Sequence, residues 1–304
     1  MAREIHSSKG VRQVILHGVL TEADLSALDE KHMFLRRCIM KHLLASMVVF
    51  VLASAAPAQD YVLKRLKDSP RHHEWVKVKQ GNRTVLSFVV YPEVKDKATA
   101  VLVIHENKGL TDWVRGVADQ VAEAGYVAIA PDLLSGMGPN GGNTSDIKSS
   151  DEATKVLGKL EPEQVTADLN AVANYIVKQP ACNGKLAVAG FCWGGGQTFR
   201  FATNRSDLKA AFVFYGMFPE TKDAMAKIPC PVYGFYGEND ARINKSVPAT
   251  AKLMKDVGKT FEPVIFDGAG HGFMRAGEDP QGMEANRKAR TAAWDRWKGL
   301  LKKI

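Results

Sequence analysis

Residues Lys185 to Gly195 read KLAVAGFCWGG, and this stretch decides the fold. An apolar run of the kind that forms a buried strand leads directly into GFCWG at residues 190–194, and the residues after it can begin a helix. This is the strand, turn and helix pattern G-x-S-x-G, with Cys192 in place of Ser. Its glycines are needed because side chains in so sharp a turn would collide with neighbouring backbone. Although many cysteines in Gly-rich turns are only small apolar residues, the flanking segments favour a nucleophile at a strand tip.

Short apolar runs alternate with helix-like segments around this stretch. Strands are predicted at residues 75–78, 84–91, 100–104, 126–130, 185–190, 210–214, 232–236 and 263–266. Helices are predicted from Thr111, which would cap a helix closed by Gly125, and over about 165–177 and 282–301. Repeated strand, crossover and strand predict an α/β protein with a doubly wound, mostly parallel sheet and helices on both faces. A site should then lie at the carboxyl ends of the strands.

Two further polar residues follow later strands in the order that the turn pattern requires, an acid and then a base. Residues 233–240 read YGFYGEND, which places Asp240 past the end of an apolar strand. Residues 264–271 read VIFDGAGH, which places His271 in a Gly-rich loop after the next strand. Alone, His271 could be a structural histidine and Asp240 a turn residue. Their order and their strand context make coincidence improbable.

These residue types suit nucleophilic catalysis. A thiol is a weak nucleophile until it loses its proton, and an imidazole within hydrogen-bond reach can take that proton. Asp240 would fix the imidazole tautomer of His271 and stabilise its charged form. The oxyanion would be held by backbone N–H groups, one from Trp193 and one from the loop after residues 100–104, most plausibly Asn107. The sequence therefore predicts a hydrolase that cleaves an ester or lactone through a Cys-His-Asp triad and an acyl-enzyme intermediate.

Four motifs together resemble the dienelactone hydrolase (carboxymethylenebutenolidase) family of the α/β-hydrolase superfamily. They are HENKG at residues 105–109, PDLL at 131–134, GFCWGG at 190–195 and GAGHGFM at 268–274, and they extend over nearly the whole chain after residue 58. The resemblance implies an α/β-hydrolase fold. It also implies that Glu106 lies beside the nucleophilic Cys and helps to control its protonation. The alternative for Glu106 is a solvated loop carboxylate.

The resemblance defines the substrate less closely. The family's founding enzyme holds a substrate carboxylate with two arginines, one shortly after PDL and one four residues past the catalytic His. Arg275 matches the second, whereas residues 134–138 read LSGMG and lack the first. The implied substrate is a small-molecule ester or lactone that Arg275 would favour when it is anionic, and dienelactone itself stays open. Arg275 could instead be a surface residue that pairs with Glu278 or Asp279.

Other classes of function have less support. A general carboxylesterase or thioesterase on the same scaffold stays open, as does a non-catalytic binding protein, because fold does not fix function. The net charge of +8 is not gathered into blocks, so nucleic-acid binding is not expected. The four cysteines form no CxxC pair, so no metal is expected. Residues 133–143 are Gly-rich but lack the phosphate-loop patterns, so no cofactor is expected and we interpret them as a flexible rim of the site.

The amino-terminal segment has the three parts of an export signal. Basic residues at 36, 37 and 41 precede an apolar run at 43–56, which ends in the small residues of APA at 56–58. The run is short for a membrane span, which needs on the order of 20 residues, although an uncleaved anchor or a buried helix stays an alternative. We therefore expect residues 1–32 to be an extension from start-site choice, 33–58 a signal peptide and 59–304 a single domain. It would be exported, most plausibly to the periplasm, and act as a monomer without stable membrane association.

Export would expose two further cysteines, Cys182 and Cys230, to an oxidising compartment. The expected strand order places the strand at 210–214 between theirs, so the two strands would lie roughly 10 Å apart. A disulfide needs Cα atoms closer than about 7 Å. We therefore expect Cys182 and Cys230 to stay unbridged.

Overall fold

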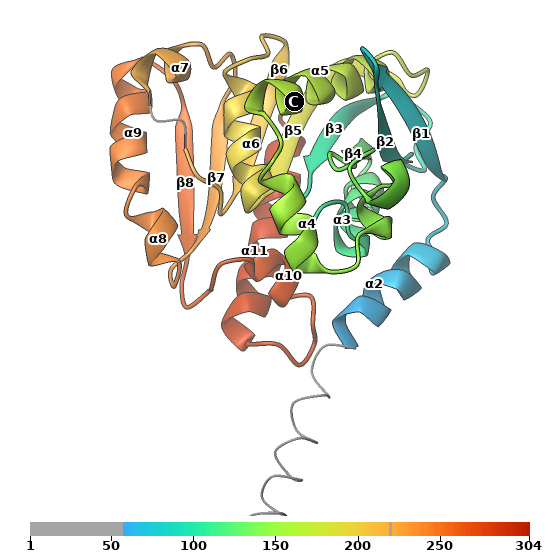
Figure 1. Ribbon diagram of the computed structural model, residues 1–304. Helices are drawn as coiled ribbons and strands as arrows, with labels where there is room; N and C mark the ends of the chain where they lie inside the picture. Colours follow the sequence, from blue (N-terminus) through green and yellow to red (C-terminus); the bar gives the residue numbers. More distant parts are fainter. Residues whose placement is uncertain (1–56, 219–220) are drawn as a thin grey trace, which may run out of the picture. The chain divides into compact units, whose positions relative to one another are not determined.

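An eight-stranded sheet runs through the part of the chain that this computed structural model describes, residues 57–218 and 221–304 (Figure 1). Its strands are β1 (His73–Gln80), β2 (Arg83–Val90), β3 (Ala98–Ile104), β4 (Val127–Pro131), β5 (Cys182–Phe191), β6 (Leu208–Phe214), β7 (Val232–Gly237) and β8 (Phe261–Phe266). They lie in the order β1-β2-β4-β3-β5-β6-β7-β8. β1 and β2 form an antiparallel hairpin that adds to β4, and all later neighbours are parallel. The predicted mostly parallel sheet is confirmed.

Helices cover both faces of this sheet, as predicted (Figure 1). One face carries α2 (Pro57–Asp68), α3 (Asp112–Glu123), α10 (Phe273–Ala276) and α11 (Glu284–Leu301). The other carries α5 (Pro162–Ile176), α6 (Trp193–Ala202), α7 (Lys222–Ala226) and α9 (Val247–Asp256). The residues of β3 and β4 are all buried, because a central parallel strand has a helical layer on each side. The wholly apolar runs in the sequence therefore marked the central strands.

That residues 133–143 form a flexible rim of the site remains a prediction. They open the segment between β4 and α5. It contains two 3₁₀ turns, η1 (Pro139–Gly141) and η2 (Thr144–Asp146), and the helix α4 (Ser150–Leu157). Its start is buried because the Asp132 carboxylate accepts hydrogen bonds from the backbone N–H of Leu134 at 3.0 Å and of Thr144 at 2.8 Å. Thr144 Oγ1 in turn accepts from the N–H of Leu110 at 3.2 Å. The segment is thus anchored to the loop after β3.

The expected extension at residues 1–32 and nearly all of the expected signal peptide lie outside the described residues. Only residues 57 and 58 of that peptide are described, and they stand in the first turn of α2. In the part of the chain that the structure describes, no helix is both long and apolar enough to span a membrane. The expectations on export therefore stay predictions.

The two spare cysteines lie as the strand order predicts. Cys182 is the first residue of β5, Cys230 comes shortly before β7, and β6 lies between these strands. Both side chains are buried and carry free thiols. That they also stay unbridged under oxidising conditions remains a prediction.

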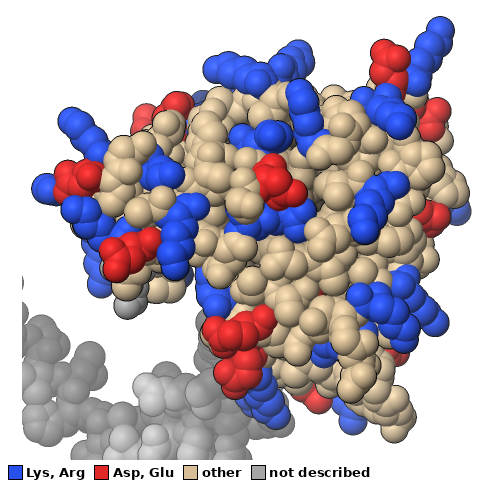
Figure 2. Space-filling view, turned by 90° about the horizontal axis from the view of Figure 1, so that it is seen from above, with Lys and Arg blue, Asp and Glu red and all other residues tan. Residues whose placement is uncertain are grey.

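Basic side chains are scattered over the face shown in Figure 2, with acidic side chains among them. A surface that binds nucleic acid through the phosphates gathers its Lys and Arg residues into a patch or stripe. The even spread on this face gives no support to a nucleic-acid partner.

Candidate active site

Cys192 lies in the sharp turn between β5 and α6. Its backbone has φ 54° and ψ −115°, a conformation that a residue with a side chain adopts only under constraint. Its N–H donates to the carbonyl of Phe214 at 3.0 Å, which ties the turn to β6. A Cβ on Gly190 would lie 2.2 Å from the carbonyl oxygen of Gly194, and one on Gly194 would lie 2.3 Å from that of His105. These two glycines are therefore required by backbone contacts.

The structure brings together the three residues that the sequence order singled out. Asp240 follows β7 and precedes α8 (Ala241–Asn244), and His271 lies in the loop between β8 and α10. His271 Nε2 lies 3.1 Å from Cys192 Sγ, and His271 Nδ1 lies 2.5 Å from Asp240 Oδ2. The buried Asp240 carboxylate has no proton to donate, so the proton in its contact with His271 is on Nδ1. Nε2 is then the ring nitrogen that faces the thiol.

The loop that carries His271 is held at several points. The N–H of Gly270 donates to Asn286 Oδ1 of α11 at 3.0 Å. The carbonyl of Ala269 accepts from the N–H of Asn239 at 2.9 Å, which joins this loop to the one that carries Asp240. Gly268 and Gly272 have φ values of 64° and 75°, a region that suits glycine. The loop is therefore held both by α11 and by the loop that carries Asp240.

The surroundings of His271 favour its charged form. The hydrogen bond with Cys192 and that with Asp240 raise the pKa of His271 to about 9, against the opposing effect of burial. The ordinary value for histidine is about 6.5. The raised pKa makes the imidazole a stronger base toward the proton of an adjacent thiol.

Glu106 makes two side-chain contacts, both with residues distant in the sequence. Its buried carboxylate accepts from Arg275 Nε at 3.0 Å and from Tyr215 Oη at 3.4 Å. No hydrogen bond joins it to Cys192 Sγ among the described residues, and its expected part in controlling the protonation of that thiol remains a prediction. The alternative of a solvated loop carboxylate is wrong, because the side chain is only 7% exposed.

Arg275 pairs with Glu106 and does not pair where the surface alternative placed it. That alternative paired it with Glu278 or Asp279, but Glu278 pairs with Arg65 of α2 and with Arg290 of α11. Burial would lower the pKa of Arg275, yet the charge of Glu106 and the hydrogen bond to it raise that pKa overall. The side chain is 46% exposed, and its terminal nitrogens donate to no group of the described residues. They are free to meet a ligand.

Tyr215 was not among the residues predicted for the site. This residue follows β6, is fully buried and has φ 40°. Its ring packs edge-on against the imidazole of His271, with centroids 5.0 Å apart. Burial and the nearby charge of Glu106 raise the pKa of Tyr215 well above its usual range, so it stays a neutral hydrogen-bond donor. The one signal in the sequence was its position directly after β6, the strand that lies next to the strand leading into Cys192.

Trp193 and Asn107, the two residues expected to supply oxyanion donors, each have a backbone N–H that is available to a ligand. Trp193 is the first residue of α6, and the first N–H groups of a helix have no partner inside it. The N–H of Asn107 donates to no acceptor in the described part of the chain, while its carbonyl accepts from Thr154 Oγ1 at 3.1 Å. Both residues thus offer the type of donor that was expected of them.

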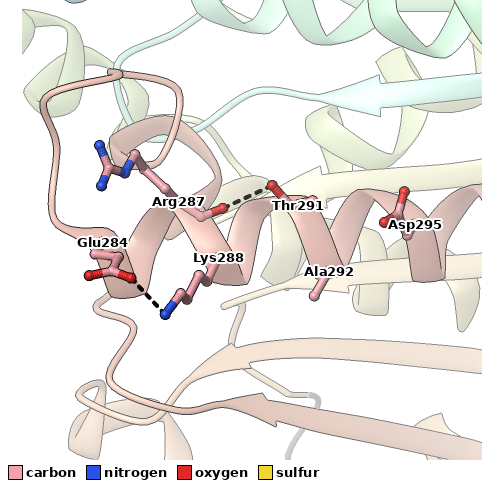
Figure 3. A pocket seen from close by; sticks show the side chains of 6 residues that line it. All are labelled: Glu284, Arg287, Lys288, Thr291, Ala292 and Asp295. Atoms are coloured by element: carbon pink, nitrogen blue, oxygen red, sulfur yellow. Dashed lines mark hydrogen bonds and ion pairs between the residues drawn. The ribbon is translucent and has the colours of Figure 1, made fainter.

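A hollow along α11 does not compete with this site (Figure 3). Its lining side chains all come from that one helix: Glu284, Arg287, Lys288, Thr291, Ala292 and Asp295. Lys288 Nζ pairs with Glu284 Oε1 at 2.6 Å, a contact between residues four apart that stabilises a helix. The hollow offers no thiol, no imidazole and no convergent backbone donors. Among the described residues no group of His, Cys, Asp and Glu is arranged to hold a metal ion.

A family model and individual relatives both place this chain with the dienelactone hydrolases. Residues 86–304 match the model of the dienelactone hydrolase family. A "putative carboxymethylenebutenolidase" of Saccharolobus solfataricus is 28% identical over 251 residues, which cover 72% of this chain and 94% of that protein. A protein of the same description from Salmonella typhimurium is 30% identical over 227 residues, which cover 71% of this chain and 80% of that protein.

Solved structures show the same fold at lower identity. A dienelactone hydrolase-like promiscuous phosphotriesterase from metagenomic libraries superposes with a TM-score of 0.65 at 20% identity, over 77% of this chain and 98% of that one. The dienelactone hydrolase of Anabaena variabilis gives a TM-score of 0.56 at 17% identity, over 74% of this chain and 96% of that one. Both cover nearly the whole of the solved chain, so the likeness extends to the complete fold.

Proposed function

The chain belongs to the dienelactone hydrolase family and is a hydrolase of ester or lactone bonds, and on that premise we propose that Cys192 is its nucleophile. The observation that supports this most is the chain of contacts from Cys192 Sγ to His271 Nε2 at 3.1 Å and from His271 Nδ1 to Asp240 at 2.5 Å. A nucleophile, a base and an orienting acid in hydrogen-bond contact are the parts that acyl transfer through a covalent intermediate needs.

The proposed reaction has two halves. The thiol proton of Cys192 passes to His271 Nε2, and the thiolate attacks the carbonyl carbon of the ester or lactone. The C–O bond then breaks, and the imidazolium returns its proton to the leaving oxygen. In the second half His271 takes a proton from water, which attacks the thioester and releases the acid and the thiol. Asp240 keeps the imidazole in the required tautomer throughout.

The oxyanion of each tetrahedral intermediate would be held by the N–H groups of Trp193 and Asn107. Backbone donors suit this task because they are already fixed before the charge develops, so no reorganisation is needed in the transition state. Glu106 would act on the thiol indirectly, through neighbouring residues. Through its contacts with Arg275 and Tyr215 it sets the charge balance around the site.

The rate of turnover should change with pH near the raised pKa of His271. Because that pKa is raised to about 9, the proton on Nε2 is present below this value and is lost as the pH rises through it. For an alkyl ester, whose leaving oxygen needs a proton, kcat/KM should therefore fall above that pH. A p-nitrophenyl ester needs no such proton and is the control, with a weaker fall or none. Profiles for both esters that stay flat and parallel across this range would contradict the assignment.

Arg275 should favour substrates that carry a carboxylate. Its terminal nitrogens are free while Nε stays with Glu106, so a substrate carboxylate could pair with them. A charged hydrogen bond contributes roughly 1.5 to 3 kcal/mol, or about ten- to a hundredfold in kcat/KM, less at an exposed site. The ratio of kcat/KM for a carboxylated ester to that for its neutral methyl analogue should fall by this factor in Arg275→Met. Arg287→Met, on α11, is the matched control, and an unchanged ratio in Arg275→Met would remove the role.

Two alternatives to this function can be separated by experiment. A general carboxylesterase or thioesterase would differ in the substrates that it prefers, so rates across aryl esters, thioesters and lactones would distinguish it. A non-catalytic binding protein would hydrolyse none of them. It would also lack a reactive thiol, whereas the contact between Cys192 and His271 predicts rapid alkylation at neutral pH.

We also propose export, with removal of residues 1–58. The support is the order of basic, apolar and small residues before position 59. In the structure, a chain starting at residue 59 keeps Val62 and Leu66, which pack α2 into the core. Mass spectrometry of the protein recovered from outside the cytoplasm should give an amino terminus at or near Gln59. A recovered protein that retains residues 43–56 would contradict this.

A further inference from the structure

His105 is a fully buried histidine that the reaction as described does not use. It directly precedes Glu106 and Asn107 in the loop after β3. Its Nδ1 lies 2.7 Å from the carbonyl oxygen of Glu106, and its Nε2 lies 3.3 Å from the backbone nitrogen of Leu133. A buried polar side chain whose two nitrogens both meet backbone groups costs stability unless its partners are retained.

These two contacts fix the protonation of the ring. A carbonyl oxygen can only accept, so Nδ1 must donate, and a backbone N–H can only donate, so Nε2 must accept. The ring is therefore the neutral tautomer with its proton on Nδ1. Burial also lowers the pKa of His105, which agrees with a neutral ring. His105 is thus a fixed donor on one side and a fixed acceptor on the other.

The donor side of the ring acts on the peptide group between Glu106 and Asn107. That group contains both the carbonyl held by His105 and the N–H of Asn107, and it is planar and trans. In a trans peptide the C=O and the N–H point in opposite directions. Fixing the carbonyl of Glu106 therefore fixes the direction of the N–H of Asn107. The hydrogen bond from Thr154 to the carbonyl of Asn107 restrains the next peptide group in the same way.

His105 also contacts the other side of the turn. Its ring stacks on the indole of Trp193, with centroids 5.5 Å apart and an angle of 15° between the planes. Its own carbonyl oxygen would lie 2.3 Å from a Cβ on Gly194, so the loop after β3 and the start of α6 pack as closely as their backbones allow. One side chain thus joins the two segments whose N–H groups would meet the substrate oxygen.

We propose that His105 is a positioning residue for the oxyanion site. It fixes the direction in which the N–H of Asn107 points, and it fixes the position of this N–H relative to the N–H of Trp193. This rests on the proposed function, since it presumes that both N–H groups bind the oxygen that becomes charged. Oxyanion donors act mainly in the transition state. The loss of His105 should therefore lower kcat and leave KM nearly unchanged, and it should spare steps that form no oxyanion.

The matched pair His105→Asn and His105→Gln tests which contact matters. The amide of Asn sits where Nδ1 was and can still donate to the carbonyl of Glu106, whereas that of Gln sits where Nε2 was. We expect kcat for ester hydrolysis to fall by roughly ten- to a hundredfold in His105→Gln, as for a displaced oxyanion donor, and by much less in His105→Asn. KM should change by less than about threefold in both. The opposite order of the two variants, or equal losses, would overturn the inference.

Alkylation of Cys192 by iodoacetamide provides the second readout. This reaction needs the thiolate but forms no oxyanion, so its rate should stay within about twofold of wild type in both variants. A parallel loss of alkylation and turnover would show that His105 acts on the thiol or on the fold, and would overturn the proposal. His73→Gln, which removes a half-buried histidine bonded to Asp119 at 2.8 Å, controls for a general loss of stability and should keep its turnover. Failure of the proposed function would look different, because wild-type turnover would then survive complete alkylation of Cys192.

Discussion

Replacement of Cys192 by Ala should lower kcat/KM for every ester that the wild type cleaves by at least about 10⁴-fold. In the proposed mechanism Cys192 Sγ forms the acyl intermediate, and this atom lies 3.1 Å from His271 Nε2 at the tip of a strained turn. The variant should fold normally, because Ala is smaller than Cys and the strain at this position does not depend on the thiol. Circular dichroism and thermal unfolding would verify this.

The chain offers two matched controls for Cys192→Ala. Cys182→Ala and Cys230→Ala each remove a buried thiol at the amino-terminal end of a strand, whereas Cys192 lies at a carboxyl-terminal end. Burial raises the pKa of Cys230 to about 12, so that thiol is not a nucleophile at neutral pH. Both variants should keep wild-type turnover to within about threefold, with a small loss of stability from the vacated volume. If Cys192→Ala retained most of its activity on any substrate, the proposed mechanism would fail.

Replacement of His271 by Ala should be the next most damaging change, with a loss of about 10³-fold or more at neutral pH. Without the imidazole, no base takes the proton of the thiol and no acid gives a proton to the leaving oxygen. Asp240→Asn should cost less than either of these changes, because it disturbs the tautomer and leaves the base in place. The double variant of Cys192 and His271 should be no worse than Cys192→Ala alone, since the two residues act as one unit.

Alkylation rates would show why His271→Ala is inactive. In the proposed mechanism, His271 takes the thiol proton of Cys192 and so makes the thiolate available at neutral pH. In the variant, the alkylation rate at neutral pH should drop and then recover as the pH rises toward about 8.5, where an isolated thiol ionises by itself. A variant that is alkylated at the wild-type rate at neutral pH would mean that His271 does not activate the thiol. His72→Ala, at an exposed position before β1, is the matched histidine control.

The sequence predicted most of the sheet because central parallel strands are continuous apolar runs, and such runs are visible without any partner. It also predicted the segments that bring Cys192, Asp240 and His271 together, since each follows a strand in a fixed order. Helix α4 was missed although Ser149 and Glu152 have the spacing of a helix start, and the Ser149 side chain does accept from the N–H of Glu152 at 3.2 Å. The helix is only eight residues long, so its apolar residues give a weak helical period.

The contacts of Glu106 could not have been predicted in the same way. Its partners Tyr215 and Arg275 lie 109 and 169 residues away in the chain. No local pattern reports a pairing at that distance, and the family resemblance directed attention to the thiol instead. His105 illustrates a second limit. A histidine next to a glutamate in a loop gives no sign of burial, because its partners are backbone groups that any sequence would supply.

The groups around Cys192 come from separate connections at one end of the sheet. Glu106 follows β3, Tyr215 follows β6, Asp240 follows β7, and Arg275 lies beyond β8. Each of these connections can accept substitutions or insertions without disturbing the strands, whose apolar contacts lie in the layers beneath. In evolutionary terms, substitutions at the proposed substrate contacts can then be inherited separately from the thiol, although Arg275 shares its connection with His271. A lineage could change the compound that it degrades by altering residues 134–138 or Arg275 while the thiol, its base and the core stay the same.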